Sequence, residues 1–209
     1  MTQPPLSPGS ADALLFDLGR VVLDIDFSRA FACWARHAGC APEKLVGRLS
    51  VGELNHRHER GEISDPEYFA GQCAAMGIAL SDGQFLEGWN AIFAGEMPGI
   101  APLLERAAQR LPLYAFSNTN AAHVGHFSVA YADVLGIFRE MFLSNAIGLR
   151  KPDAAAYDHV VNAIGVPAGR IVFFDDLAAN IEGAQVRGLR AVHVKSADDV
   201  AQALKTLGI

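Results

Sequence analysis

Short apolar runs alternate with longer segments of mixed polarity along most of this chain. Five runs are predicted strands, at residues 13–16, 113–116, 141–143, 171–174 and 191–194. The segments between and after them are predicted helices, at 100–110, about 119–132, from 151 onward, 180–188 and the C-terminal end. Buried apolar strands that alternate with helices indicate a parallel sheet covered on both faces. The pattern therefore predicts an α/β fold with a doubly wound parallel sheet.

The pattern changes between residues 27 and 95, where helix follows helix and no strand is evident. Two capping boxes, Ser64-Asp-Pro-Glu67 and Ser81-Asp-Gly-Gln84, mark helix starts in this block. We therefore expect a small helical cap inserted after the first strand. The predicted domains are an α/β core made of residues 12–26 and 96–209 and a cap made of residues 27–95.

Polar residues follow the predicted strands at their carboxyl ends. Asp17, Ser117-Asn118 and Asp175-Asp176 each come directly after an apolar run, and Lys151 lies a few residues beyond another. In open parallel sheets, ligands bind just beyond the carboxyl ends of the strands. These residues are therefore predicted to meet at one rim of the sheet.

The chemistry of this set suits a phosphate ester. Asp17 and Asp176 offer the hard oxygen ligands that Mg²⁺ prefers, and Asp175 either joins them or orients them. A carboxylate that attacks a dianionic phosphate meets charge repulsion, which a metal ion and Lys151 would offset. Ser117 and Asn118 add hydrogen-bond donors. A structural alternative exists for several of these positions, because a polar side chain there can cap the helix that follows it. It applies to Ser117, Asn118, Asp153, Asp175 and Asp176.

Composition narrows the class of protein further. Of the 209 residues 51% are hydrophobic and 19% are charged, and the formal net charge is −6. These values favour a globular core and argue against nucleic-acid binding, which needs a basic face. No apolar run reaches the ~18 residues of a membrane helix. The three cysteines lack CxxC spacing and the N-terminal segment lacks a secretory pattern, so a cytoplasmic protein is expected.

The motifs resemble those of the haloacid dehalogenase superfamily, from about Ala13 to the end of the chain. The four matching segments, in order, are Leu15-Phe-Asp-Leu-Gly-Arg-Val-Val22, Phe116-Ser-Asn-Thr-Asn120, Lys151-Pro152 and Val172-Phe-Phe-Asp-Asp-Leu-Ala-Ala-Asn180. The resemblance implies a Rossmann-like core with a helical cap, Asp17 as nucleophile, and Ser117 and Lys151 as phosphate-holding residues. It also implies a Mg²⁺ site formed by Asp17, the Gly19 carbonyl, Asp176 and Asp175.

A narrower resemblance is to the bacterial α-D-glucose-1-phosphate phosphatases. It is carried by segments that include His58-Glu-Arg-Gly-Glu-Ile-Ser64 and Gly88-Trp-Asn-Ala-Ile-Phe93, both in the predicted cap. This resemblance implies a small phosphorylated metabolite as substrate, a sugar phosphate such as α-D-glucose 1-phosphate, hydrolysed through an aspartyl phosphate on Asp17. It makes no prediction of the oligomeric state.

One position departs from the pattern of the superfamily phosphatases. They carry a second Asp two residues after the nucleophile as general acid and base, and this chain has Gly19. Such help is worth ~10²–10⁴ in rate. Either the anomeric oxygen of a sugar 1-phosphate leaves with little protonation, or Asp24, Asp26 or a cap histidine (His56 or His58) transfers the proton.

Two other functions are compatible with the same motifs. A 2-haloacid dehalogenase would use Asp17 on carbon without metal, which leaves the Asp175-Asp176 pair unexplained, and the dehalogenase branch has an aromatic residue in place of Gly19. A non-catalytic phosphate-binding protein on this fold is the second alternative, because Gly19 removes the usual acid.

Overall fold

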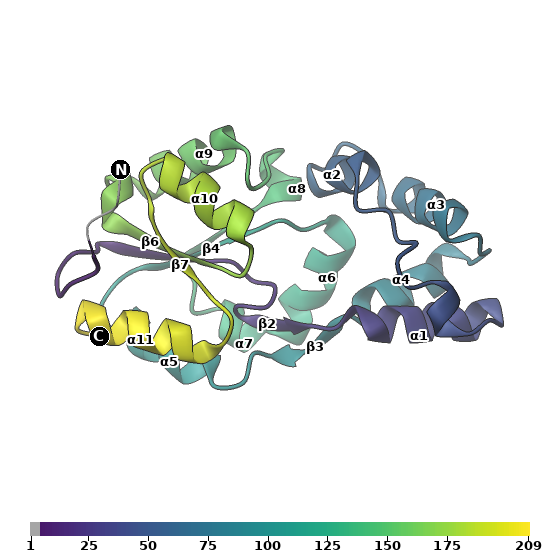
Figure 1. Cartoon of the computed structure of the whole chain (residues 1–209), viewed down its shortest axis with the longest axis horizontal. Helices are drawn as coiled ribbons and strands as arrows, with labels where there is room; N and C mark the ends of the chain where they lie inside the picture. The colour runs from purple at the N-terminus through teal and green to yellow at the C-terminus, as the bar shows by residue number, and fades with distance from the viewer. Residues whose placement is uncertain (1–4) are drawn as a thin grey trace.

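A computed structural model describes residues 5–209 of the chain. Its main sheet contains five parallel strands in the order β5-β4-β1-β6-β7. Those strands are β1 Ala13–Phe16, β4 Leu113–Ser117, β5 Glu140–Leu143, β6 Ile171–Asp175 and β7 Arg190–His193. Helices cover both faces of the sheet, with α9 and α10 above it and α5 and α11 below it in Figure 1. The predicted doubly wound α/β fold is therefore confirmed.

The apolar runs of the sequence become the two buried layers on either side of the sheet. Leu14 and Phe16 of β1 pack in the layer that contains Leu104 of α5. Leu15, between them, points to the other face and packs in the layer that contains Tyr157 of α9. Alternate side chains of a strand point to opposite faces, so a strand that is apolar throughout is covered on both.

The core helices and short turns have the following bounds: α5 Ile100–Ala108, α6 Ala121–Ala130, α7 Ala132–Leu135, α8 Ser144–Ile147, α9 Ala154–Ile164, the 3-10 turn Ala168–Arg170, α10 Ala178–Val186 and α11 Ala197–Leu207. The helix predicted to open at Lys151 instead begins at Ala154, with Asp153 as its N-cap residue. Pro152 lies in the turn before this helix, where its ring fixes the backbone φ angle and does not interrupt the helix.

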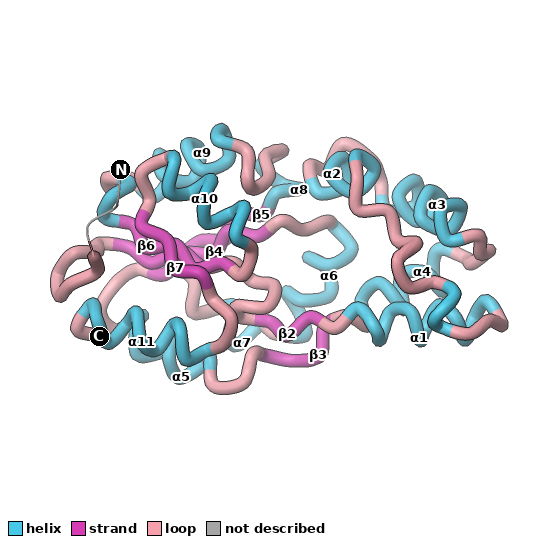
Figure 2. The backbone as a smooth tube through the Cα atoms, viewed as in Figure 1, coloured by secondary structure: helices cyan, strands magenta, loops and turns pink. Residues whose placement is uncertain are grey.

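The cap lies to one side of the core, at the right of Figure 2. It contains α1 Phe27–Ala38, the 3-10 turn Pro42–Lys44, α2 Glu53–Glu59, α3 Asp65–Met76 and α4 Asp82–Asn90. Trp34, Tyr68, Phe85 and Trp89 form the centre of its own apolar cluster. The capping boxes at Ser64 and Ser81 start α3 and α4 as predicted.

The two segments that join cap and core form a ribbon that the sequence pattern does not reveal. β2 Leu23–Ile25 pairs antiparallel with β3 Phe93–Glu96. The expectation that residues 27–95 contain no strand is therefore wrong, because β3 exists through pairing with a segment some seventy residues earlier. The domain boundaries at 26/27 and 95/96 stay a prediction, and β3 crosses the second of them.

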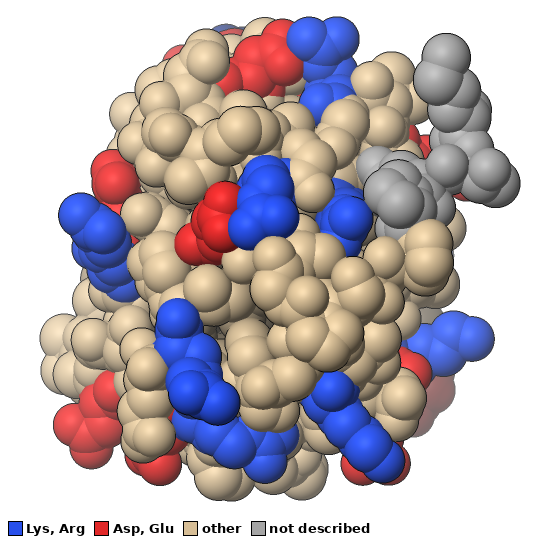
Figure 3. Space-filling view, turned by 90° about the vertical axis from the view of Figure 1, so that its left-hand side faces the viewer, with Lys and Arg blue, Asp and Glu red and all other residues tan. Residues whose placement is uncertain are grey.

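Charged side chains are dispersed on the end of the core that faces away from the cap. On the face seen in Figure 3, Lys and Arg lie in separate positions among neutral and acidic residues. None of the helices within residues 5–209 combines the length and apolar composition that a membrane crossing needs.

Candidate active site

The strand ends bring the predicted polar residues to one rim of the sheet. Asp17 follows β1, Ser117 ends β4 and Asp175 ends β6. Asp17, Ser117, Lys151 and Asp175 are all buried, with 9%, 5%, 1% and 0% of their surfaces exposed. The structure therefore assembles, at the carboxyl end of the sheet, the set that the sequence placed there.

Lys151 lies at the centre of this set. Its Nζ is 3.0 Å from Oδ1 of Asp17 and 2.7 Å from Oδ2 of Asp175. It also donates a hydrogen bond of 2.7 Å to the carbonyl of Phe116. The rings of Phe116 and Phe173 lie 5.1 and 5.2 Å from Nζ. These contacts fix the ammonium beside Asp17, the predicted nucleophile, where a transferring phosphate would need a positive charge.

Asn118 positions Lys151 through the backbone. The amide group of Asn118 donates to the Lys151 carbonyl at 2.9 Å, and its oxygen accepts from the Lys151 N–H at 2.8 Å. Asn118 also lines the cavity described below. Both ends of the Asn118 amide, which was predicted to bind substrate, are therefore hydrogen-bonded to the backbone of Lys151.

Both oxygens of Asp175 are engaged by protein groups. Oδ1 accepts from the Leu177 N–H at 2.8 Å, and the Asn180 amide donates to Oδ1 and Oδ2 at 2.9 and 3.0 Å. Oδ2 is also the partner of Lys151. Because its lone pairs are used in this way, Asp175 is better suited to orienting Lys151 than to replacing Asp176 at a metal.

Burial changes the protonation of the site. Burial raises the pKa of Asp17 to about 7, although the charge of Lys151 acts against it. Burial alone would lower the pKa of Lys151, but the carboxylates of Asp17 and Asp175 outweigh it and the pKa is raised. Burial, together with Asp175, also raises the pKa of Asp176. The site therefore holds more carboxyl groups than its single lysine balances, and a further cation would stabilise their charged forms.

The acidic groups fit a divalent metal ion. One carboxylate oxygen from each of Asp17, Asp175 and Asp176 lies within 4.8 Å of the other two. Because protein groups already engage both Asp175 oxygens, Asp17 and Asp176 are the carboxylates with capacity for a metal. Gly19 lines the same cavity. A set of hard oxygen donors without sulfur or imidazole suits Mg²⁺ better than zinc or copper. The donor set thus agrees with the predicted cofactor.

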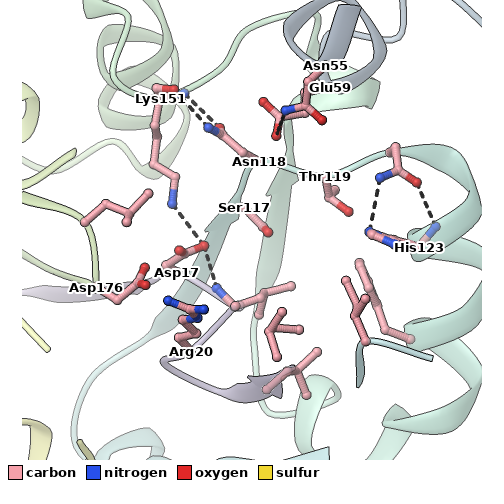
Figure 4. A pocket seen from close by; sticks show the side chains of 18 of the residues that line it. Asp17, Arg20, Asn55, Glu59, Ser117, Asn118, Thr119, His123, Lys151 and Asp176 are labelled. Carbon is pink, nitrogen blue, oxygen red and sulfur yellow. Dashed lines mark hydrogen bonds and ion pairs between the residues drawn. The ribbon is translucent and has the colours of Figure 1, made fainter. Parts of the chain in front are cut away.

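A cavity of about 420 Å³ lies between the core and the cap, above the strand ends. Asp17, Lys151 and Asp176 are among the residues that line it, as Figure 4 shows. The cap contributes two polar side chains to its lining, Asn55 and Glu59 of α2. The remaining cap lining is apolar: Phe27, Leu49, Val51, Trp89, Ile92 and Phe93.

Asn55 and Glu59 were not identified from the sequence. They are four residues apart on α2, and the Asn55 amide donates to Glu59 Oε1 at 3.0 Å. Arg150 of the core donates to Glu59 Oε2 at 2.7 Å, which joins the cap to the residue before Lys151. Their spacing of four placed them on one face of a helix, but only the fold shows that this face points into the cavity.

The residues predicted to replace an acid at position 19 lie elsewhere. Asp24, Asp26, His56 and His58 are absent from the lining of the cavity. Asp26 caps α1 by accepting from the Ser28 N–H. His58 is buried within the cap, where it hydrogen-bonds Asp65 at 2.7 Å and stacks on Tyr68 at 3.9 Å. None of them is therefore among the side chains that surround Asp17 in the cavity.

Comparison with known proteins agrees with this site. A model of the haloacid dehalogenase-like hydrolases matches residues 11–188. The chain belongs to this family. Phosphatase MT3486 of Mycobacterium tuberculosis strain CDC 1551 is 34% identical over 95% of this chain and 96% of its own length.

This haloacid dehalogenase-like hydrolase also matches part of a longer protein and the fold of solved structures. Drimenol cyclase drtB of Aspergillus calidoustus is 26% identical over 93% of this chain, but the match spans only 36% of the cyclase. A family enzyme of Bacteroides thetaiotaomicron, solved with magnesium and inorganic phosphate, is 24% identical with a TM-score of 0.76, over 89% of this chain and 95% of that one. These findings confirm the predicted superfamily and hydrolase class.

Proposed function

We propose that the protein is a Mg²⁺-dependent phosphatase that hydrolyses a small phosphate ester through an aspartyl phosphate on Asp17. The observation that supports this most directly is the buried Lys151 ammonium, 3.0 Å from Asp17 Oδ1, beside a cluster of three carboxylates. An oxygen-rich metal site next to a carboxylate nucleophile and a lysine is what attack on a dianionic phosphate requires.

In this proposal Asp17, Asp176 and the Gly19 carbonyl hold Mg²⁺, which supplies positive charge for the phosphate oxygens. Asp175 keeps Lys151 in place, and Lys151 and Ser117 bind the transferring group. Asp17 attacks phosphorus, and water then hydrolyses the aspartyl phosphate. The cap encloses the cavity and limits the access of bulk water.

We further propose a sugar phosphate as substrate, with α-D-glucose 1-phosphate as the example to test first. Asn55, Glu59 and Arg150 place amide, carboxylate and guanidinium groups on the cavity wall. Such groups recognise hydroxyls, since each hydroxyl both donates and accepts. The apolar wall opposite accommodates a ring face or an alkyl chain, so an alkyl phosphate belongs in the same test.

The experiment is phosphate release from glucose 1-phosphate, other sugar phosphates and an alkyl phosphate, with Mg²⁺ or with chelator. We expect metal-dependent release that Asp17→Asn abolishes. Release of halide from a 2-haloacid without Mg²⁺ would support the dehalogenase alternative instead. Binding of phosphate and Mg²⁺ without turnover of any ester would support a non-catalytic protein.

A further inference from the structure

Arg20 is a charged residue of the cavity that the proposed reaction leaves without a role. It follows Gly19, lines the cavity and is exposed. Within residues 5–209 its guanidinium makes no hydrogen bond or ion pair. In Figure 4 the guanidinium lies beside Asp17 and Asp176, while Lys151 reaches Asp17 from the opposite side. The carboxylate cluster of Asp17, Asp175 and Asp176 therefore has two cations near it, Lys151 beside Asp17 and Asp175 and Arg20 near Asp176, and of the two only Lys151 is fixed by protein contacts.

The backbone holds Arg20 in an unfavourable conformation. Its φ of 58° is the only positive value for a residue other than glycine in the described chain. The Arg20 N–H donates to the Leu23 carbonyl at 2.7 Å, which stabilises the loop in this shape. A left-handed conformation costs a side-chain-bearing residue roughly 1–2 kcal/mol. Strained backbone of this kind clusters at functional sites, so an arginine in this conformation whose guanidinium has no hydrogen-bonded partner points to a role in function.

The charge of Arg20 acts inside the site. Burial and the neighbouring Asp175 raise the pKa of Asp176, and the charge of Arg20 acts in the opposite direction. An arginine stays protonated at all physiological pH values, so it cannot donate a proton as an aspartic acid would. It can, however, donate hydrogen bonds to an oxyanion and stabilise the negative charge that develops there.

We propose that Arg20 is a catalytic residue that stabilises the negative charge developing on the leaving oxygen, in place of the acid missing at Gly19. This inference rests on the proposed phosphatase function. As an Asp17 oxygen bonds to phosphorus, the bond from phosphorus to the ester oxygen breaks, and its electron pair stays on that oxygen. The leaving oxygen lies on the far side of phosphorus from Asp17, and the unpaired Arg20 side chain, which lines the same cavity, would reach it there. A water molecule then protonates the departed oxygen and becomes hydroxide.

The second step regenerates the carboxylate. The oxygen of another water bonds to phosphorus, the bond from phosphorus to Asp17 breaks, and the electron pair returns to Asp17. The phosphate leaves with both protons of that water and gives one to the hydroxide. The overall products are the alcohol and hydrogen phosphate, so the reaction needs no proton from a side chain. Arg20 lowers the barrier only where charge accumulates on the ester oxygen.

The test is kcat/KM with Mg²⁺ for a series of phosphate monoesters, from 4-nitrophenyl phosphate to alkyl phosphates. Arg20→Asn removes the charge and keeps a residue that tolerates a left-handed backbone. We expect a loss on the order of 10²-fold for alkyl esters. For 4-nitrophenyl phosphate, whose oxygen leaves readily, the loss should stay below about threefold. Arg20→Lys should recover part of the activity on alkyl esters.

Arg29→Asn is the matched control, because Arg29 is exposed on α1 and lies outside the cavity lining. It should behave as the wild type with every ester, and circular dichroism should show that all variants are folded. An equal loss for all esters in Arg20→Asn would mean that Arg20 acts on the phosphate or the metal, and no loss would mean that it is not catalytic; either overturns the inference. A wild type that hydrolyses none of the esters overturns the proposed function, and the inference with it.

Discussion

At the scale of single residues, Gly19 leaves the site without the second aspartic acid that the superfamily phosphatases carry. A Cβ built at this position meets only Ile25 Cγ1, at 3.6 Å, which is an ordinary van der Waals distance, and the backbone there is not left-handed. The space at the Cβ position does not require a glycine. Steric crowding at the Cβ position therefore does not explain why residue 19 is a glycine and not an aspartic acid.

We therefore predict that Gly19→Asp raises kcat for alkyl and sugar phosphates. Positioned acid–base help is worth ~10²–10⁴ in rate, and an engineered group should realise the lower part of that range. Phosphate release with saturating Mg²⁺ measures the effect. Gly83→Asp, which adds the same charge on an exposed part of α4 with open space around it, is the control. A folded Gly19→Asp enzyme with unchanged kcat would show that proton transfer does not limit the reaction.

His123 is a buried residue whose protonation bears on stability. Its Nδ1 lies 3.1 Å from the Asn120 amide, and its Nε2 lies 3.0 Å from the carbonyl of Trp89 in the cap. The ring therefore fits as the neutral form, accepting at Nδ1 and donating at Nε2. Burial lowers its pKa to about 3. It joins core and cap and is not a proton donor at neutral pH.

This shift predicts acid-sensitive stability. Between pH 6.5 and about 3 the unfolded chain binds a proton at His123 that the folded chain does not. The free energy of unfolding should fall by up to about 1.4 kcal/mol per unit as the pH drops through this window. Urea unfolding at several pH values measures the slope, which His123→Asn should reduce. His159→Asn, an exposed substitution on α9, should leave the slope unchanged.

At the scale of elements, α1 and α4 approach so closely that a glycine is required. A Cβ at Gly88 of α4 would lie 2.2 Å from Trp34 Nε1, and that indole is itself fixed by a hydrogen bond of 2.9 Å to the Phe85 carbonyl. The clash is with a buried ring that cannot rotate away without losing this bond. Gly88 therefore sets the distance between the two helices.

We predict opposite effects of alanine at two glycines of α4. Gly88→Ala should destabilise the protein by about 1–3 kcal/mol, because it overpacks the cap. Gly83→Ala, which meets nothing within 4 Å, should stabilise it by up to about 1 kcal/mol through helix propensity. Thermal or urea unfolding of the two variants measures the contrast. Equal effects at both sites would contradict the packing explanation.

Elements that depend on local sequence could be predicted, and elements that depend on distant pairing could not. The strand at 13–16 is apolar throughout and the helix at Ser64 has its own cap, so both were found. β3 was missed because it is held by pairing with β2. The strand ends predicted the places of Asp17, Ser117 and Lys151 in the site. Glu59 could not be predicted in this way, because it faces the cavity only through the packing of the cap over the core.

At the scale of the whole molecule, cap and core meet across the cavity through Glu59 and Arg150. Their side chains are 17% and 14% exposed, and Nε of Arg150 lies 2.7 Å from Glu59 Oε2. Such a partly buried pair is screened less than a surface pair. Arg150 precedes Lys151 in the chain, so the residue that contacts the cap is adjacent to the residue that contacts Asp17.

Glu59 has two possible tasks, holding the cap and binding substrate hydroxyls, and exchanging the two charges separates them. Glu59→Arg or Arg150→Glu alone should lower kcat/KM about tenfold for any ester, within the coupling range of neighbouring pairs. The double variant should recover activity on 4-nitrophenyl phosphate, because the ion pair across the cavity is restored. It should not recover activity on glucose 1-phosphate, because an arginine at position 59 cannot accept hydrogen bonds from the sugar. Recovery on both esters would limit Glu59 to holding the cap and would remove the main support for a sugar substrate.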